Sequence, residues 1–242
     1  MKKGPVHDTL HYFLIAVFLA LAVLFIARFA GGPILRIYVQ SGIGDCRRIP
    51  VLCMAPTQNI TGPQIDKEYA ATLIYNRFPR MSVSTPRGFS VVQELIKKVY
   101  YKKHKRMDNG AVVYLLHQDP GYFISLYPQV KAQGVADNYH FMKRMLYSKE
   151  SDINGITEAF FVIMKSIFTP DLGDQSGVVM AEISMPGKRG FINYSLGKKD
   201  NYFDCNIITD KDVFFKVYIK DRGARLDLPK VFAVISTLQE VE

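Results

Sequence analysis

The hydrophobic pattern of the chain begins with a long apolar run close to its N-terminus. Sixteen consecutive residues from Tyr12 to Ala27 carry no charge, and Arg28 ends the run. A helix of this length spans roughly 24 Å, and its interfacial flanks bring it to the roughly 30 Å of a bilayer core. The lack of a good small-x-small cleavage site favours an uncleaved anchor over a signal peptide. We therefore expect a short N-terminal tail, 1–11, and a transmembrane anchor, 12–30.

Residues 31–64 are rich in glycine and proline and show no sustained periodicity, which indicates a linker. Cys46 and Cys53 lie within it, and Pro50 between them favours a turn. Two thiols this close in an exposed segment oxidise readily outside the cytoplasm, so the pair is a disulfide candidate, with two free thiols as the alternative. A metal site needs more ligands than this pair supplies, and we expect no metal ion.

From residue 65 onwards the spacing of apolar residues switches between helical and strand periods. Asp137, Ser151 and Asp227 are placed to cap three of the predicted helices. Strict alternation in the last strands predicts an antiparallel meander with one buried face. The predicted helices cover 65–78, 138–148, 152–168 and 226–241. Strand chemistry is predicted within 80–106, with a turn or bulge at 85–89 and a hairpin stem at 98–102, and further strands are predicted over 111–118, 122–128, 178–185, 190–196, 202–208 and 213–219.

The order of these elements (helix, strands, helices, strands, helix) predicts an α+β fold. We expect an antiparallel β-sheet covered by helices, an α/β/α sandwich, in one globular domain over 65–242. With 48% apolar and 22% charged residues, the chain can bury a large core, which excludes a disordered protein. Tyr100, Phe214 and Tyr218 on outer strand faces would add to a contact surface if no helix covered them.

The net charge of +9 arises from 31 basic and 22 acidic residues and is concentrated in one stretch. Residues 97–106 hold six basic side chains and no acid, and Asn109-Gly110 behind them predicts a hairpin. A solvated hairpin tip is the simplest interpretation. A functional interpretation is that the stretch contacts anionic lipid or an acidic protein surface. Binding of nucleic acid is the least favoured interpretation. The contact candidates are Lys97, Lys98, Lys102, Lys103, Lys105, Arg106, Tyr100 and Tyr101.

Two opposing signals bear on the side of the membrane. Arginines after the predicted anchor favour a cytoplasmic domain by the positive-inside rule. The short tail with Lys2 and Lys3 is hard to translocate, however, and the cysteine pair favours an oxidising compartment. We therefore expect a single-pass protein of the inner membrane whose C-terminal domain is extracytoplasmic, in the periplasm.

Three stretches of the domain carry a family resemblance. They are the strand entry TPRGFSVV, the meander GFINYSL, YFDCNII and FFKVYIKDR, and the closing helix VFAVISTLQ. Over residues 80–240 the chain resembles in topology the PsbP-like superfamily, which includes an extrinsic protein of photosystem II, a Ran-binding nuclear import factor and bacterial envelope lipoproteins. The resemblance implies an α+β sandwich and non-catalytic docking on a larger assembly. It transfers no site residue.

Enzyme signatures such as a nucleophile elbow, a phosphate-binding loop or a dinucleotide fingerprint are absent from the sequence. Turn capping explains Asp171 and Asp174 more simply than a bound cation does. We therefore expect a membrane-anchored, non-catalytic docking protein of the bacterial cell envelope, with a protein partner and no cofactor. The alternative is a ligand-binding module or enzyme with a pocket near His117, beside Asp119, and the loop 169–176.

Overall fold

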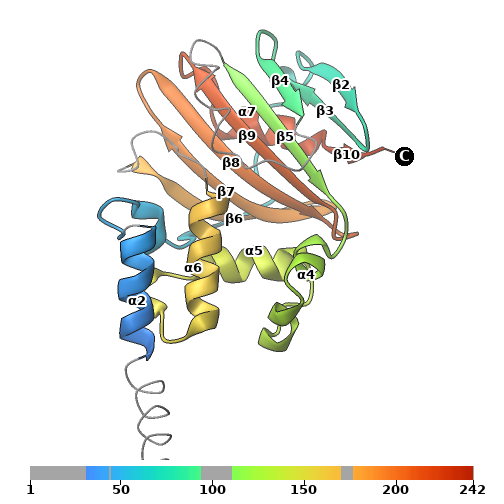
Figure 1. The fold of residues 1–242 in the computed structure, drawn as a ribbon. Helices are drawn as coiled ribbons and strands as arrows, with labels where there is room; N and C mark the ends of the chain where they lie inside the picture. Colours follow the sequence, from blue (N-terminus) through green and yellow to red (C-terminus); the bar gives the residue numbers. More distant parts are fainter. Residues whose placement is uncertain (1–30, 44, 94–110, 170–176, 242) are drawn as a thin grey trace, which may run out of the picture.

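A computed structural model describes most of the chain (Figure 1). The described residues are 31–43, 45–93, 111–169 and 177–241. The predicted anchor, 12–30, lies outside them. Within the described ranges no helix combines the length and the apolar character needed to cross a membrane. This finding corrects the predicted fold class with its transmembrane anchor, the membrane-anchored character of the protein and its single-pass location in the inner membrane.

A seven-stranded sheet forms the centre of the molecule. Its strands are β1 (Gln58–Thr61), β4 (Ser90–Gln93), β5 (Val112–Gln118), β6 (Val179–Met185), β7 (Lys188–Leu196), β8 (Asp200–Thr209) and β9 (Phe214–Arg222). They lie in the order β1-β6-β7-β8-β9-β5-β4 (Figure 1). β6 to β9 pair antiparallel, each with the next, and form the meander that the alternating pattern predicts.

The sheet as a whole is mixed, which corrects the predicted antiparallel sheet. β1 runs parallel to β6 and β4 runs parallel to β5, so the outermost pair at each edge is parallel. Alternation reports which face a side chain occupies but not the direction of its strand, so the sequence pattern fits both arrangements. The predicted hairpin stem before β5, 98–102, lies outside the described residues. The described strand before it, β4, runs parallel to β5 and so does not form a hairpin with it.

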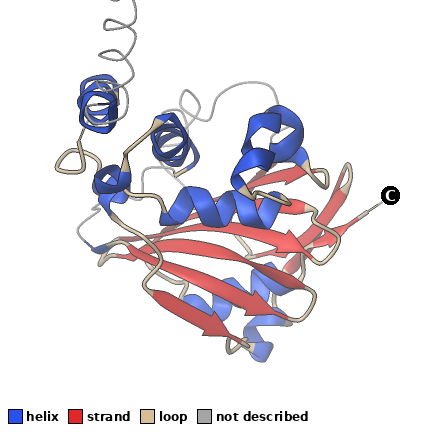
Figure 2. Ribbon diagram, turned by 90° about the horizontal axis from the view of Figure 1, so that it is seen from below, coloured by secondary structure: helices blue, strands red, loops and turns tan. Residues whose placement is uncertain are grey.

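Helices cover both faces of the sheet (Figure 2). The helices are α2 (Gly31–Gly42), α3 (Lys67–Ala70), α4 (Tyr122–Leu126), α5 (Asn138–Tyr147), α6 (Ile156–Phe168) and α7 (Leu228–Ser236), with 3-10 helices η1 (Pro50–Cys53), η3 (Pro128–Gln133) and η4 (Glu150–Asp152). α4, α5 and α6 pack on one face. The other face carries α7, α3 and a small antiparallel sheet of order β10-β3-β2, made of β10 (Gln239–Glu240), β3 (Met81–Thr85) and β2 (Ile74–Phe78).

Both faces of the meander are buried, whereas the alternating pattern predicted one buried face. Phe214 and Tyr218, predicted to point outward, are 0% and 3% exposed. They lie under the helical layer, where the Phe214 ring packs edge to face against Phe123 of α4 at 5.2 Å between centroids. These two aromatic side chains therefore do not form an outer contact surface, and Tyr100 lies outside the described residues.

Side-chain caps fix the starts of two predicted helices. Asp137 and Asp227 each accept a hydrogen bond from the backbone N–H three residues further on, at the starts of α5 and α7. Both predicted caps are confirmed. The cap predicted at Ser151 is wrong, because α6 begins after Gly155 without a side-chain cap.

Three predicted elements differ from the structure because tertiary contacts outweigh the local pattern. The closing helix, predicted to residue 241, ends at Ser236, and β10 then pairs with β3. Residues 122–128, predicted as a strand, contain α4, whose Phe123 ring stacks on Phe141 at 4.5 Å between centroids. The helix predicted over 65–78 ends at Ala70, and β2 then pairs with β3.

The segment predicted as a linker, 31–64, is folded onto the domain. It contains α2, η1 and β1, and α2 lies beside α6 (Figure 1). An apolar cluster of its own joins it to α6, and this cluster consists of Val39, Leu52, Ile153, Ala159 and Val162. The position of α2 is therefore set by packing.

Candidate docking surface

The inner face of α2 approaches the body of the protein closely. Leu35 and Val39 pack into the cluster shared with α6. A Cβ atom at Gly32 would stand 2.8 Å from the Cα atom of Asn154, closer than real side chains are found. Glycine at this position therefore allows the helix to lie against the backbone of residues 153–154.

The outer face of α2 is an exposed apolar stripe. Ile34, Ile37 and Tyr38, hereafter the α2 stripe, are 55%, 65% and 73% exposed. Their spacing of three and four residues places them side by side on the helix. Large apolar side chains gathered on one exposed face mark an interaction site more strongly than scattered ones do. The α2 stripe is therefore the candidate docking surface.

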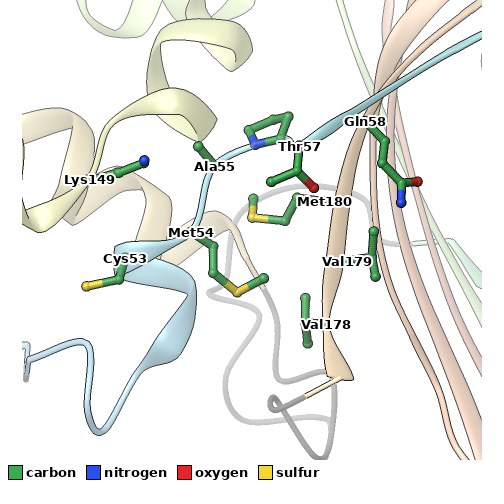
Figure 3. Close-up of a pocket in the computed structure, with 10 residues that line it drawn as sticks. Cys53, Met54, Ala55, Thr57, Gln58, Lys149, Val178, Val179 and Met180 are labelled. Carbon is green, nitrogen blue, oxygen red and sulfur yellow. The ribbon is translucent and has the colours of Figure 1, made fainter.

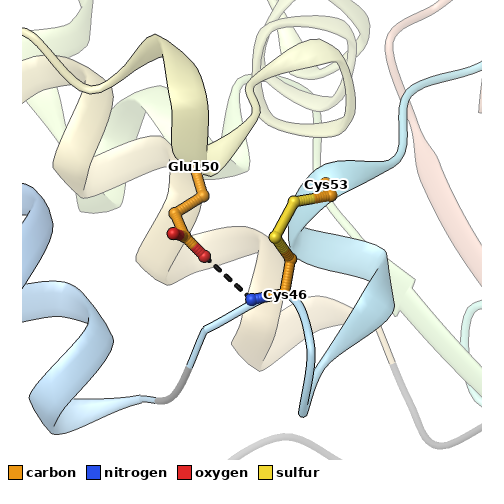
Figure 4. Close-up of side chains that lie close together, drawn as sticks. All are labelled: Cys46, Cys53 and Glu150. Carbon is orange, nitrogen blue, oxygen red and sulfur yellow. Dashed lines mark hydrogen bonds between the residues drawn. A yellow bond between two sulfur atoms is a disulfide. The ribbon is translucent and has the colours of Figure 1, made fainter.

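Polar contacts hold α2 and the loop that follows it against η4, and Figure 4 shows the one between Cys46 and Glu150. The carboxylate of Glu150 accepts hydrogen bonds from the side-chain amide of Gln40 and from the backbone N–H of Cys46, the latter at 2.9 Å. The guanidinium of Arg36 donates to the carbonyl of Ser151. These contacts fix the helix that carries the stripe, because they tie it to a segment more than a hundred positions away in the sequence.

A disulfide joins Cys46, in the loop after α2, to Cys53, the last residue of η1 (Figure 4). This is the pair that the sequence marks as the disulfide candidate. Their Cα atoms are 5.4 Å apart, a usual separation for bonded cysteines. The third cysteine, Cys205, is free and buried in the sheet. The disulfide ties the loop that connects α2 to η1 to the last residue of η1.

Loss of this disulfide is expected to lower the free energy of unfolding by about 2–3 kcal/mol, because the loop 46–53 regains its freedom in the unfolded chain. The variant Cys46→Ser/Cys53→Ser tests this expectation by urea unfolding without reductant. Added reductant should weaken the wild-type protein by the same amount and leave the variant unchanged. An equal effect of reductant on both proteins would contradict the assignment to this bond.

A shallow pocket of ≈ 380 Å³ lies between the disulfide loop and β6 (Figure 3). Its described lining consists of residues 53–58, Lys149 and residues 178–180. Apolar side chains and backbone dominate this lining, and Lys149 is its one charged group. Since these described residues bring no set of polar side chains together, the pocket does not argue for catalysis.

The described residues do not assemble the alternative pocket near His117. The imidazole packs edge to face against Phe215 on the α7 side of the sheet, and burial lowers its pKa. Thr169 follows Phe168, whose carbonyl accepts a hydrogen bond from Lys216 on the opposite side. Because successive residues of β9 point to opposite faces, the sheet separates His117 from Thr169. The rest of that loop lies outside the described residues.

Several residues predicted from the sequence lie outside the described residues, and the sequence analysis missed two features that the structure shows. The basic and aromatic candidates within 97–106, and Asp171 and Asp174, lie outside the described residues. Glu150 was missed because it stands 104 positions from Cys46 and no local pattern links the two. The α2 stripe was missed although its spacing is visible, because the surrounding glycines and prolines indicated a linker.

Comparison of the chain with protein-family models, curated proteins and solved structures gives no match. The resemblance to the PsbP-like superfamily stays a prediction from the sequence. The function is therefore argued from the geometry of the described residues.

Proposed function

We propose that the chain is a non-catalytic docking protein whose α2 stripe inserts into an apolar groove on a partner protein. The observation that carries the proposal is the exposure of Ile34, Ile37 and Tyr38 on a helix whose other face is packed. Helices that dock into grooves use anchors at positions i, i+3 and i+4, which is the spacing of these three residues.

The fixed position of α2 favours binding. Glu150, the disulfide loop and the cluster on α6 hold the helix in place before any partner arrives. A preorganised surface loses less conformational entropy when it docks, so more of the burial energy appears as affinity. Tyr38, the most exposed of the three, belongs to the residue types that dominate the energetics of interfaces.

Charge in the loop after α2 indicates the chemistry of the partner. Arg47 and Arg48 are exposed in the loop that follows α2, and the whole chain carries a net charge of +9. An apolar groove with an acidic rim would complement both features and accelerate association. The resemblance to the PsbP-like superfamily, which implies docking on a larger assembly, supports the same class of function.

Photo-crosslinking in cells that make the full-length chain tests the proposal. A benzoylphenylalanine at position 37 is expected to form an adduct with one partner protein, whereas the same residue at Thr72, exposed in the turn after α3, is expected to form none. The identified partner is then purified and titrated against the full-length chain by calorimetry. Ile37→Asp is expected to weaken binding about 30-fold or more, because an interface anchor contributes at least about 2 kcal/mol.

The control for this experiment is the stability of the variant. Because Ile37 is exposed, Ile37→Asp should leave the thermal midpoint nearly unchanged. Equal adducts at positions 37 and 72, or unchanged affinity of Ile37→Asp, would contradict the docking surface. An adduct between two copies of this chain would assign the stripe to self-association and overturn the proposed groove.

A further inference from the structure

The cysteine pair and Glu150 bring three metal-ligating side chains together (Figure 4). The two Sγ atoms and a carboxylate oxygen of Glu150 all lie within 4.8 Å of one another. Cys46 comes from the loop after α2, Cys53 is the last residue of η1 and Glu150 belongs to η4, so the fold assembles the cluster. In the disulfide the two sulfur atoms are bonded to each other and cannot act as thiolate ligands.

The carboxylate of Glu150 is buried without a cationic partner among the described residues. It is 5% exposed, and both of its described hydrogen bonds come from uncharged donors, the side chain of Gln40 and the backbone N–H of Cys46. No ion pair to its carboxylate is found among the described residues. A buried carboxylate is costly without an opposite charge nearby, so this site favours a cation.

We propose that the reduced form of the protein binds one zinc ion through Cys46, Cys53 and Glu150. A dithiol reductant supplies the first step: the Cys46–Cys53 bond breaks, each cysteine gains one hydrogen, and the dithiol is oxidised to its own disulfide. Zinc then displaces the two thiol protons to solvent and binds both thiolates and the carboxylate. Water completes four-coordination, as is usual for zinc with three protein ligands.

Reduction of the disulfide brings the spacing of the ligand atoms closer to the spacing that zinc requires. Zinc–sulfur bonds of about 2.3 Å and zinc–oxygen bonds of about 2.1 Å place neighbouring ligand atoms of a tetrahedron roughly 3.4–3.8 Å apart. Breaking the disulfide moves the two sulfur atoms apart towards this spacing. Glu150 is already within reach of both. Arg47 and Arg48 directly follow Cys46 in the sequence and bring positive charge to the loop that carries this ligand.

Cobalt titration of the full-length protein tests the site. The protein is reduced with dithiothreitol, desalted under nitrogen and titrated with Co²⁺, whose bonds to thiolates give a charge-transfer band in the near ultraviolet. The expected result is a band that saturates at one cobalt per chain, disappears on addition of Zn²⁺ and is absent before reduction. No band in the reduced protein, or an equal band in the oxidised protein, would overturn the proposal.

Matched variants separate the three ligands from other groups. Cys46→Ser/Cys53→Ser is expected to abolish the band, and Cys205→Ser to keep it. Glu150→Gln keeps the shape of the side chain and is expected to weaken cobalt binding roughly tenfold or more, since a carboxylate ligand is lost. Gln40→Ala removes a hydrogen bond to the same carboxylate but no ligand, and it should retain one cobalt per chain. Equal affinities of Glu150→Gln and wild type would overturn the role of Glu150.

Discussion

Lys216→Met is expected to lower the free energy of unfolding by about 3–5 kcal/mol, because it leaves a buried carboxylate without its cation. The Nζ atom of Lys216 lies 2.7 Å from the Oδ1 atom of Asp204, and the two side chains are 1% and 0% exposed. Asp204→Asn should have a similar effect, since it leaves the ammonium buried without its counter-ion. Urea unfolding at neutral pH measures both.

A double variant shows whether the loss of stability arises from the ion pair between Asp204 and Lys216. Asp204→Leu/Lys216→Met removes both charges and is expected to cost much less than the sum of the two single changes, because no unpaired charge remains. Additive losses would contradict a coupled pair. Arg80→Met serves as the control, because it breaks an ion pair with Asp119 whose side chains are more than half exposed, and it should change stability little.

The buried pair also connects the sheet to the helices that carry the candidate docking surface. Lys216 donates a further hydrogen bond, at 2.6 Å, to the carbonyl of Phe168, the last residue of α6. α6 in turn supports α2 through their shared apolar cluster. Variants of the pair are therefore expected to loosen the support of the α2 stripe, whereas Ile37→Asp changes the stripe alone.

The sequence predicted those elements in which local pattern and tertiary packing agree. The meander, α5 and α7 were found because alternation or helical spacing coincides with the buried faces, and because Asp137 and Asp227 are strong caps. Lys216 lies on the same face of the strand as Phe214 and Tyr218, the face that was predicted to point outward. Its burial depends on Asp204, one strand away, and on the end of α6.

The candidate site was partly visible from the sequence. The short spacing of Cys46 and Cys53 marked a disulfide, because two thiols in one short loop can reach each other without knowledge of the fold. Glu150 became their neighbour through long-range folding alone. Strand direction was equally hidden, because parallel and antiparallel pairs share the same alternation.

The stability of the protein is expected to rise with pH above neutrality because of Lys165. This side chain of α6 is 0% exposed, and its Nζ atom donates hydrogen bonds to the carbonyls of Met54, Leu146 and Ser148. Burial, assisted by nearby Lys149 and opposed by Asp152, lowers the pKa of Lys165 to about 7. An ordinary lysine of the unfolded chain keeps its proton up to a pKa of about 10.4.

The direction of this pH dependence follows from the number of protons that the folded and unfolded states bind. Between pH 7 and 10 the unfolded chain holds a proton on this lysine that the folded protein has released, so rising pH favours the folded protein by about 1.4 kcal/mol per pH unit. Lys165→Met removes the titration and takes away the donor of these carbonyls, two of which a neutral amine can still serve, so the variant should be less stable than wild type above neutrality. Urea unfolding at pH 7.5, 8.5 and 9.5 should show the difference between the two proteins widening at each step. Burial also lowers the pKa of Lys188, but Lys188 is present in both proteins and cancels in the difference. A constant gap between wild type and Lys165→Met would show that Lys165 keeps its proton, held by the three carbonyls, throughout this range.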